Sequence, residues 1–239
     1  MTESPKANNI LMECRDVVKM FRNRAALNHL SFTLPSGSIV GLLGPNGSGK
    51  TTLMKLSCGL IRPTSGEIRI TGKTPGVETK KVVAYLPDAN YLNDWMKVHD
   101  LIQMFADFYA DFNPAKAETL VRDLNIDPSQ RLKTLSKGTK EKIQLVLVMS
   151  RNAKLYLLDE PIGGVDPAAR EYIINTILGN YNPEATILIS THLISDVESL
   201  LDHALFLKDG RIVMDGSVDQ LREESGKSLD ALFREVFKC

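Results

Sequence analysis

One glycine-rich stretch constrains this 239-residue chain more than any other. It runs in order through Gly44, Pro45, Asn46, Gly47, Ser48, Gly49, Lys50, Thr51 and Thr52. The pattern Gly-x-x-x-x-Gly-Lys-[Ser/Thr] is that of a phosphate-binding loop. Its glycines let the backbone curl around phosphate oxygens, and the helix that follows points free N–H groups at the anion. In such a loop the lysine reaches the β- and γ-phosphates, and the first threonine hydroxyl can bind Mg²⁺.

The residues around the loop favour the same interpretation. Residues 38–43 form a short apolar run with no helical period, which is typical of a buried parallel strand. Residues 51–60 predict a helix, with Leu53, Leu56, Cys58 and Leu60 available for packing. A phosphate-binding loop requires a strand before it and a helix after it, and the sequence predicts both.

A second informative stretch is the apolar segment 154–158, which leads into Asp159 and Glu160. It predicts a buried strand with two carboxylates at its carboxyl end. Adjacent buried carboxylates are costly unless a cation or a proton-transfer task retains them. Next to a phosphate-binding loop, an acidic residue at the tip of a strand holds Mg²⁺. We therefore expect Asp159 to face Mg²⁺ and Glu160 to act as general base toward the attacking water.

Two further side chains are candidates because of their positions. His192 follows the predicted strand 185–190, and open α/β sheets bind ligands at the carboxyl ends of their strands. Phe21 lies upstream of the loop and could either stack on an adenine ring or belong to the core. Apolar and aromatic side chains at helical spacing in residues 98–112 predict a helix whose stripe packs in the core.

Composition narrows the range of partners. Twenty-nine basic and 29 acidic residues cancel, so the chain is no polycation for nucleic acid, although a local basic patch stays possible. Cys14, Cys58 and Cys239 match no metal-binding spacing, which indicates a reducing compartment. The polar N-terminus lacks an apolar signal region. The longest apolar runs, such as Ile143–Met149, fall short of the about 20 residues that a membrane crossing needs, so we expect no spanning segment.

With the segment Leu135–Thr139 added, the chain resembles an ATP-binding cassette (ABC) ATPase, similar to the cassettes of bacterial export systems, over nearly its whole length. The resemblance rests on five ordered motifs and an upstream aromatic residue. Residues 44–52 resemble the Walker A loop, 155–160 the Walker B strand with the catalytic Glu160, 135–139 the signature motif and 164–167 the D-loop; His192 occupies the switch-histidine position and Phe21 the adenine-stacking position.

This resemblance implies the fold. It is an α/β fold: a P-loop NTPase (RecA-like) core with an antiparallel β subdomain and an inserted α-helical subdomain. The whole chain, 1–239, is then a single cassette. Residues 1–87 and 150–239 form the core with its antiparallel part, and residues 88–149 form the helical subdomain.

The resemblance also implies a mechanism with ATP and Mg²⁺ as cofactors. Two cassettes, as a homodimer or heterodimer, sandwich two ATP molecules, and Ser136 and Gly138 of one contact the γ-phosphate bound by the other. Lys50, Glu160 and His192 carry the catalysis, and hydrolysis opens the dimer. A separate transmembrane permease subunit is implied, which places the cassette peripherally at the cytoplasmic face of the cell membrane, and no nucleic-acid partner is expected.

Two positions depart from the family pattern. Asp88 replaces a glutamine that approaches Mg²⁺ and the attacking water, and we expect Asp88 to lie on the Mg²⁺ side, with Asn90 as the alternative for that role. Lys137 replaces a glycine of the signature motif, where it could add positive charge near the phosphate or be a solvated lysine at a helix start.

Three other functions compete with an export motor. A soluble cassette ATPase acting on ribosomes or nucleic acid usually has two cassettes or a coiled-coil insertion, and this chain has one cassette and no heptad tract. A small-molecule kinase or GTPase would explain neither residues 135–139 nor His192. An importer ATPase remains an alternative within transport.

Overall fold

The computed structural model describes residues 10–164 and 167–238. Its centre is a six-stranded sheet, whose strands lie in the spatial order β5 (Val83–Leu86), β6 (Leu155–Asp159), β7 (Thr186–Thr191), β3 (Ile39–Leu43), β8 (His203–Lys208) and β9 (Arg211–Ser217). The first five run parallel, and β9 returns antiparallel to β8. The carboxyl ends of the parallel strands therefore meet at one edge of the sheet, where such folds place ligands.

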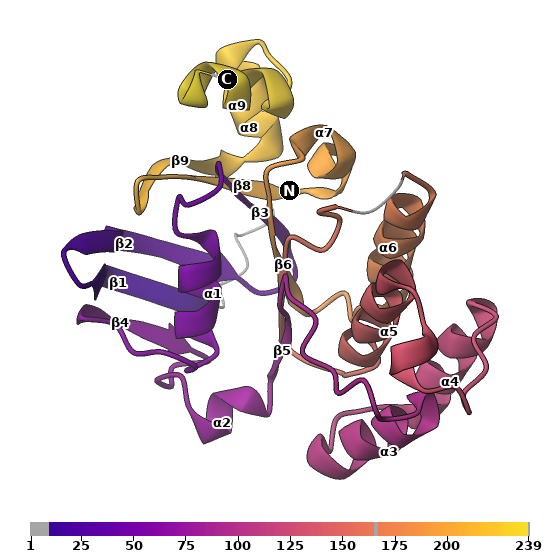
Figure 1. The fold of residues 1–239 in the computed structure, drawn as a ribbon. Coiled ribbons are helices and arrows are strands. Elements are labelled where there is room, and N and C mark those ends of the chain that lie inside the picture. The colour runs from indigo at the N-terminus through magenta and orange to yellow at the C-terminus, as the bar shows by residue number, and fades with distance from the viewer. Residues whose placement is uncertain (1–9, 165–166, 239) are drawn as a thin grey trace, which may run out of the picture.

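A second, antiparallel sheet packs against this centre. It has the order β2 (Arg24–Pro35), β1 (Ile10–Phe21) and β4 (Ser65–Ile70). Helix α1 (Lys50–Ser57) lies between the two sheets, so its apolar face is buried on the side of the antiparallel layer (Figure 1). Two short pieces follow β4: the helix α2 (Val77–Lys80), which the sequence did not predict, and then β5.

Helices cover the opposite face of the central sheet and one end of the molecule (Figure 1). They are α3 (Val98–Phe108), α4 (Pro114–Asp123), α5 (Lys137–Met149), α6 (Pro167–Asn180), α7 (Ile194–Val197), α8 (Val218–Ser225) and α9 (Leu229–Phe237), with single 3₁₀ turns at Leu132–Thr134 and Glu198–Leu200. The two C-terminal helices, α8 and α9, pack against each other and lie above β8 and β9 in Figure 1. The fold is therefore α/β with an antiparallel part and a helical part, as the sequence predicts.

The described residues form three hydrophobic clusters, and the strands of the central sheet divide their side chains between two of them. In β6, Leu155 and Leu157 face α1 and the antiparallel sheet, whereas Tyr156 and Leu158 face α5 and α6. All five residues of β6 are buried, because a parallel strand covered on both faces has no solvent side. The third cluster draws only on residues between Leu92 and Leu147.

Helix α5 contains Ile143–Met149, one of the longest apolar runs in the chain. Its residues Ile143–Met149 are all buried. Leu145 and Val148 belong to the cluster that contains Tyr156 and Leu158 of β6, whereas Val146 and Leu147 belong to the third cluster. A helix that packs on two sides needs apolar residues around most of its circumference. The run is therefore a buried connection between two clusters.

Two predictions about individual residues need correction. Helix α1 ends at Ser57, and Gly59 then adopts a left-handed φ of +66°, so Leu60 lies past the helix end and is 56% exposed. Phe108, expected in the core stripe, is 77% exposed, since no described element covers it at the last turn of α3. Helix α5 begins at Lys137 because Ser136 caps it, accepting a hydrogen bond from Thr139 N at 3.2 Å.

Candidate functional site

The glycine-rich stretch forms a tight loop between β3 and α1, as predicted. Gly49 has a φ of +115°, and a Cβ there would lie 2.5 Å from the carbonyl oxygen of Ala26, so only glycine fits. Gly49 also occupies the N-cap of α1 and offers no side-chain cap. The first N–H groups of α1 are therefore left for an anion, which is the arrangement that binds phosphate.

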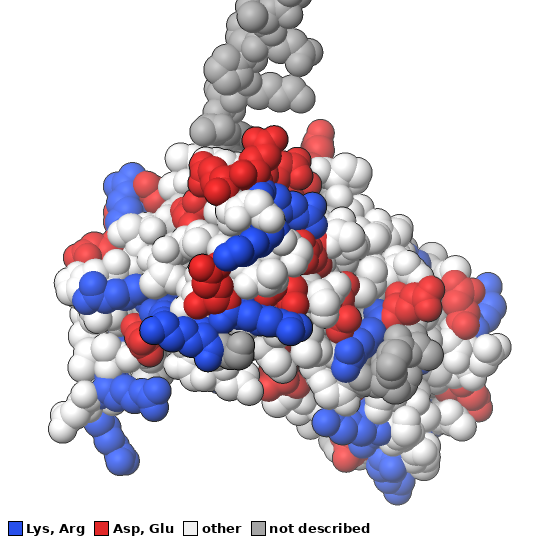
Figure 2. All heavy atoms as spheres, turned by 90° about the horizontal axis from the view of Figure 1, so that it is seen from above, with Lys and Arg blue, Asp and Glu red and all other residues white. Residues whose placement is uncertain are grey.

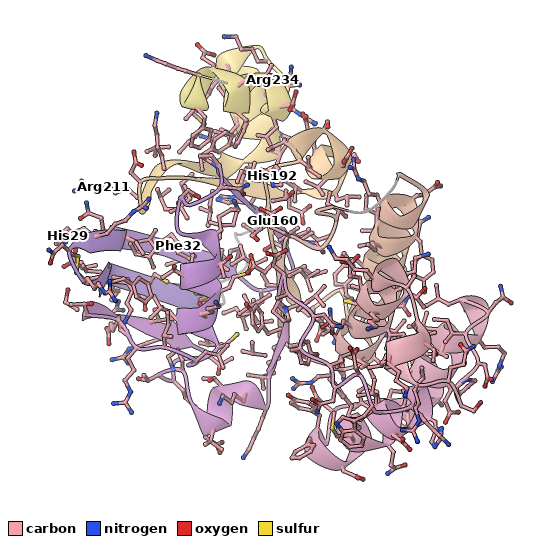
Figure 3. All side chains as sticks on the ribbon, viewed as in Figure 1. His29, Phe32, Glu160, His192, Arg211 and Arg234 are labelled. Carbon is pink, nitrogen blue, oxygen red and sulfur yellow. The ribbon has the colours of Figure 1, made fainter. Side chains whose placement is uncertain are left out.

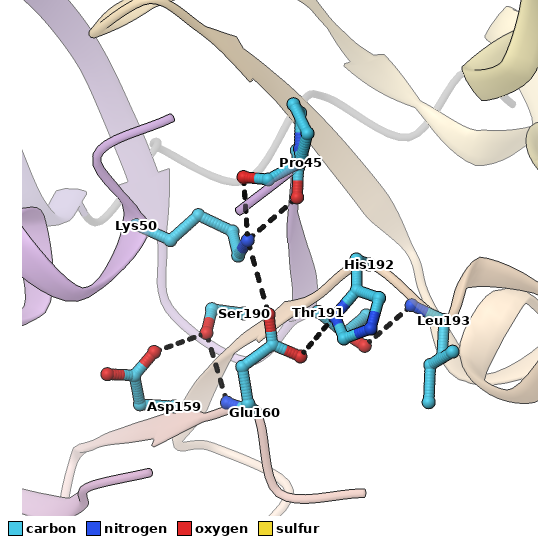
Figure 4. A network of polar contacts seen from close by, with 9 residues as sticks. Pro45, Lys50, Asp159, Glu160, Ser190, Thr191, His192 and Leu193 are labelled. Atoms are coloured by element: carbon cyan, nitrogen blue, oxygen red, sulfur yellow. Dashed lines mark hydrogen bonds and ion pairs between the residues drawn. The ribbon is translucent and has the colours of Figure 1, made fainter. Parts of the chain in front are cut away.

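Lys50 turns back into the loop that precedes it. The side chain is buried, and its Nζ donates hydrogen bonds to the carbonyl oxygens of Gly44 at 2.7 Å and Pro45 at 3.2 Å. The same Nζ forms an ion pair with Glu160 Oε1 at 3.2 Å (Figure 4). The lysine of the phosphate-binding loop and the second carboxylate of the acidic strand are thus in direct contact.

Asp159 is the last residue of β6 and is almost fully buried. Its Oδ1 accepts a hydrogen bond from Ser190 Oγ at 2.6 Å, and its Oδ2 has no hydrogen-bond partner in the described part of the chain. Burial raises the pKa of Asp159, the Ser190 hydrogen bond opposes that rise, and the charges of Asp88 and Glu160 add to it. A buried carboxylate of this kind is best stabilised by a bound cation.

Glu160 follows β6 with a strained backbone. Its φ is +48°, a left-handed conformation that costs a non-glycine residue on the order of 1–3 kcal/mol. The backbone N–H of Glu160 donates to Ser190 O at 3.0 Å and to Ser190 Oγ at 3.1 Å, which holds the residue in place. Strain retained at the tip of a strand points to a function that needs this orientation.

His192 completes a polar network at the ends of β6 and β7. Its Nδ1 lies 3.0 Å from Glu160 Oε2, and the two side chains point toward one another at the centre of the molecule (Figures 3 and 4). The carboxylate of Glu160 is therefore held between Lys50 on one oxygen and His192 on the other. The Glu160 side chain is only 12% exposed, so burial and these two contacts together restrict its conformation.

A cavity of about 340 Å³ opens beside this network. It is lined by Phe21, Arg24, Ala26, Asn46, Gly47, Gly49, Lys50, Thr51, Thr52, Asp88 and Glu160. The sequence predicted nine of these eleven residues: eight as nucleotide-binding or Mg²⁺-side residues, and Glu160 as a catalytic residue. It did not predict Arg24 or Ala26. Phe21 is 49% exposed and carries the Lys19 ammonium 5.0 Å from its ring centre, so it is not a core residue. Asn90 does not line the cavity, and its Oδ1 accepts a hydrogen bond from Leu92 N.

The signature-like residues lie elsewhere in the same chain. Ser136 is the N-cap of α5 and Gly138 lies in its first turn, and neither lines the cavity. Lys137 is exposed and lies 3.6 Å from Glu141 Oε1. Of the D-loop-like segment, Gly164 has a φ of +71°, whereas Val165 and Asp166 lie outside the described residues.

Fold and site together define a class of protein: an α/β ATPase with a phosphate-binding loop, an acid-tipped strand and a histidine at the carboxyl edge of one sheet. Comparison with known families then gives the particular group. The family model described as ABC transporter matches residues 27–163, more than half of the chain, and the chain therefore belongs to the ABC transporter family.

Named relatives and a solved structure agree with this assignment. The chain is 33% identical over 224 residues to the SkfA peptide export ATP-binding protein SkfE of Bacillus subtilis (strain 168), covering 90% of this chain and 92% of that protein. It is 28% identical over 226 residues to the Nod factor export ATP-binding protein I of Rhizobium sp. (strain N33), covering 91% and 74%. A solved structure of an ATP-binding subunit of an ABC transporter matches with a TM-score of 0.85 at 30% identity, covering 95% of this chain and 99% of that one.

The chain is thus an ATPase and an ABC transporter ATP-binding subunit. Among the described residues, no helix combines the length and apolar character that a bilayer crossing requires.

Proposed function

We propose that this chain is the ATP-hydrolysing motor of an export system, working as a pair of cassettes on a separate membrane subunit. The observation that carries the proposal is the contact of Glu160 with both Lys50 and His192 beside a cavity lined by the phosphate-binding loop. That arrangement joins phosphate binding to proton transfer in one network, which ATP hydrolysis needs and nucleotide binding alone does not.

The nucleotide would lie along the cavity with its base at one end and its phosphates at the other. Lys19 occupies one face of the Phe21 ring, so the adenine would stack on the other face. The phosphates would accept hydrogen bonds from the backbone N–H groups of residues 44–52 and the start of α1. Lys50 would pair with the β- and γ-phosphates.

Mg²⁺ fits the oxygen ligands that lie at the phosphate end. Asp159 has a buried oxygen without a hydrogen-bond partner in the described chain, and the Thr51 hydroxyl lies close enough to influence its pKa. Asp88 lines the same cavity. No group of three or more potential metal-ligating side chains forms a ready-made site in the described residues. A cation would therefore be held by Thr51, Asp159 and Asp88 together with the phosphates, as is usual for Mg²⁺. When bound, it would neutralise charge on the β- and γ-phosphates.

Glu160 is the proposed general base. Lys50 forms an ion pair with one oxygen of its carboxylate. A γ-phosphate that pairs with Lys50 would free this oxygen to orient and deprotonate the attacking water. His192 would keep the other oxygen in place and contact the γ-phosphate.

A second cassette would complete each site. Ser136 and Gly138 lie at the N-terminus of α5 but not in the cavity of their own chain. Free N–H groups at a helix start bind anions, so this end of α5 would face the γ-phosphate held by the partner cassette.

The membrane subunit would dock in a groove between the proposed core, residues 1–87 and 150–239, and the proposed helical subdomain, residues 88–149. The groove measures about 630 Å³ and is mostly apolar, with exposed Leu60, Tyr91 and Phe108 on its lining. Exposed apolar patches of this kind mark partner surfaces. Lys55 and Lys80 also line it and have no acidic partner in the described chain, so the docking segment would carry apolar side chains and a carboxylate.

Export, rather than import, is favoured by the named relatives, which include a peptide export and a Nod factor export ATP-binding protein. Docking would place the chain at the cytoplasmic face of the membrane. A nucleic-acid partner is less favoured, because the charges balance over the chain and acidic and basic side chains are mixed on the face drawn in Figure 2.

The test uses Glu160→Gln, which keeps the shape of the side chain and removes the base. We expect it to bind MgATP but to lose at least about a hundredfold in ATPase rate, and to accumulate as a dimer with MgATP in light scattering. Glu223→Gln, an exposed change in α8, is the matched control and should behave as wild type. A Glu160→Gln protein that hydrolyses ATP normally would contradict the assigned base, and one that stays monomeric with MgATP would contradict the sandwich.

A further inference from the structure

A second, exposed cation lines the cavity that Lys50 lines. Arg24 begins β2 and pairs with Phe21 across the turn between β1 and β2. Both residues line the cavity. Arg24 Nη2 lies 3.9 Å from the position that a Cβ would take on Gly47, at the tip of the phosphate-binding loop. The hairpin that presents Phe21 therefore also presents a guanidinium to that loop.

Arg24 is one of the two basic residues that line the cavity. Asp88 and Glu160 are acidic, and they offset the two basic residues, Lys50 and Arg24. Lys50 is buried and already contacts Glu160 and the carbonyl oxygen of Gly44. Arg24 is exposed and has no carboxylate partner in the part of the chain that the structure describes. A nucleoside triphosphate carries several negative charges, and of these two cations Arg24 is the uncommitted one.

We propose that Arg24 binds the polyphosphate of the nucleotide and is a further substrate-binding residue of this cassette. The inference rests on the proposed function, because it requires that ATP occupy the cavity between Phe21 and the phosphate-binding loop. A guanidinium suits this task, since its planar fork donates two parallel hydrogen bonds to phosphate oxygens. Lys50 acts from inside the loop, whereas Arg24 acts from the solvent side.

This placement predicts an effect on binding rather than on turnover. Among the described residues, Arg24 forms no hydrogen bond or ion pair with Glu160 or His192, so it lines the cavity without belonging to their network. A contact made equally in the ground state and the transition state raises KM when it is lost and leaves kcat unchanged. Loss of a residue in the Glu160 network would instead lower kcat.

The experiment measures MgATP affinity by calorimetric titration for the wild type and for Arg24→Ala, Arg24→Lys and Arg22→Ala. Arg22 is the matched control, an exposed arginine of the same turn that does not line the cavity. At about 50 mM salt, we expect Arg24→Ala to weaken binding about fivefold to tenfold and Arg22→Ala less than about twofold. The loss should shrink at about 500 mM salt, because salt screens exposed charges. Arg24→Lys should keep most of the affinity, and steady-state kinetics should place the effect of Arg24→Ala in KM.

Two results would overturn the inference: equal affinity of Arg24→Ala and Arg22→Ala, or a loss of affinity that is the same at both salt concentrations. Thermal unfolding without nucleotide checks that each variant is folded, and Arg24→Gln replaces Arg24→Ala if the latter is not. Lys50→Ala separates this inference from the proposed function. If the wild type binds no MgATP, the proposed function fails; if only Lys50→Ala loses binding, Arg24 has no role and the proposed function stands.

Discussion

Arg151 is the residue whose removal we expect to damage the fold most, and the structure allows the cost to be worked out. Its Nε and Nη2 pair with the two carboxylate oxygens of Asp111 at 3.0 and 3.1 Å. Its Nη1 donates to Val83 O at 2.6 Å, and Nη2 also reaches the carbonyl oxygens of Lys80 and Lys81. The guanidinium thus ties the end of α5 to the segment that leads into β5.

The perturbation is Arg151→Met, which keeps most of the side-chain volume and removes the charge. The Arg151 side chain is 4% exposed and that of Asp111 is 21% exposed. Breaking a buried pair by removing one partner costs about 3–5 kcal/mol, and the partial exposure of Asp111 favours the lower end, about 3 kcal/mol. For a chain of this size, each kcal/mol lowers Tm by about 2–4 °C. The expected drop is therefore about 6–12 °C.

The assay is differential scanning calorimetry, supported by urea unfolding. Arg69→Met is the control, because it breaks the exposed pair with Glu67 and should cost less than about 1 kcal/mol. In a double-mutant cycle with Asp111→Asn, we expect a coupling energy above about 1 kcal/mol between Arg151 and Asp111. A Tm drop of no more than that of Arg69→Met would refute the reasoning, since it would mean that solvent replaces these buried hydrogen bonds without cost.

Two further predictions concern the partner and the metal. Phe108→Glu, at the groove, should reduce the share of the protein that sediments with membranes while leaving the ATPase activity of the isolated protein intact. Val213→Glu, at an exposed position of β9, is the control. An unchanged membrane fraction for Phe108→Glu would contradict the docking surface. Asp88→Asn should alter the Mg²⁺ concentration that half-saturates ATPase activity, while Asp107→Asn should not; a Mg²⁺ titration identical to wild type would show that Asp88 is not on the Mg²⁺ side.

Features that depend on neighbouring residues in the sequence could be predicted well. The strand, loop and helix around residues 44–52 are present, and so is the buried strand that ends at Asp159. Local sequence patterns are sufficient for these elements. A run of apolar residues predicts a strand that is buried on both faces, and glycines mark the positions where the backbone turns tightly. Together with the other ordered motifs, these segments carried the resemblance to the family, and the resemblance implied the α/β fold.

Other features depend on residues far apart in the chain, and they appear only in the folded structure. Nothing in the sequence pairs Glu160 with Lys50, which lies 110 positions earlier, or marks Arg24 as a lining residue of the nucleotide cavity. The same holds for Phe108, which has the helical spacing of a core residue and yet is exposed. Periodicity predicts which face of a helix is apolar, but it does not predict how far along the helix other elements pack against that face.

The sequence by itself therefore determined the chemistry that this protein carries: a loop for phosphates, carboxylates at the end of one strand and a histidine directly after another. Only the tertiary structure decided which of these groups contact one another: Lys50 pairs with Glu160, whereas Arg24 has no carboxylate partner among the described residues. The physical reason is that a motif specifies donors and acceptors, whereas their distances and burial come from packing of the sheet layers that bring them together.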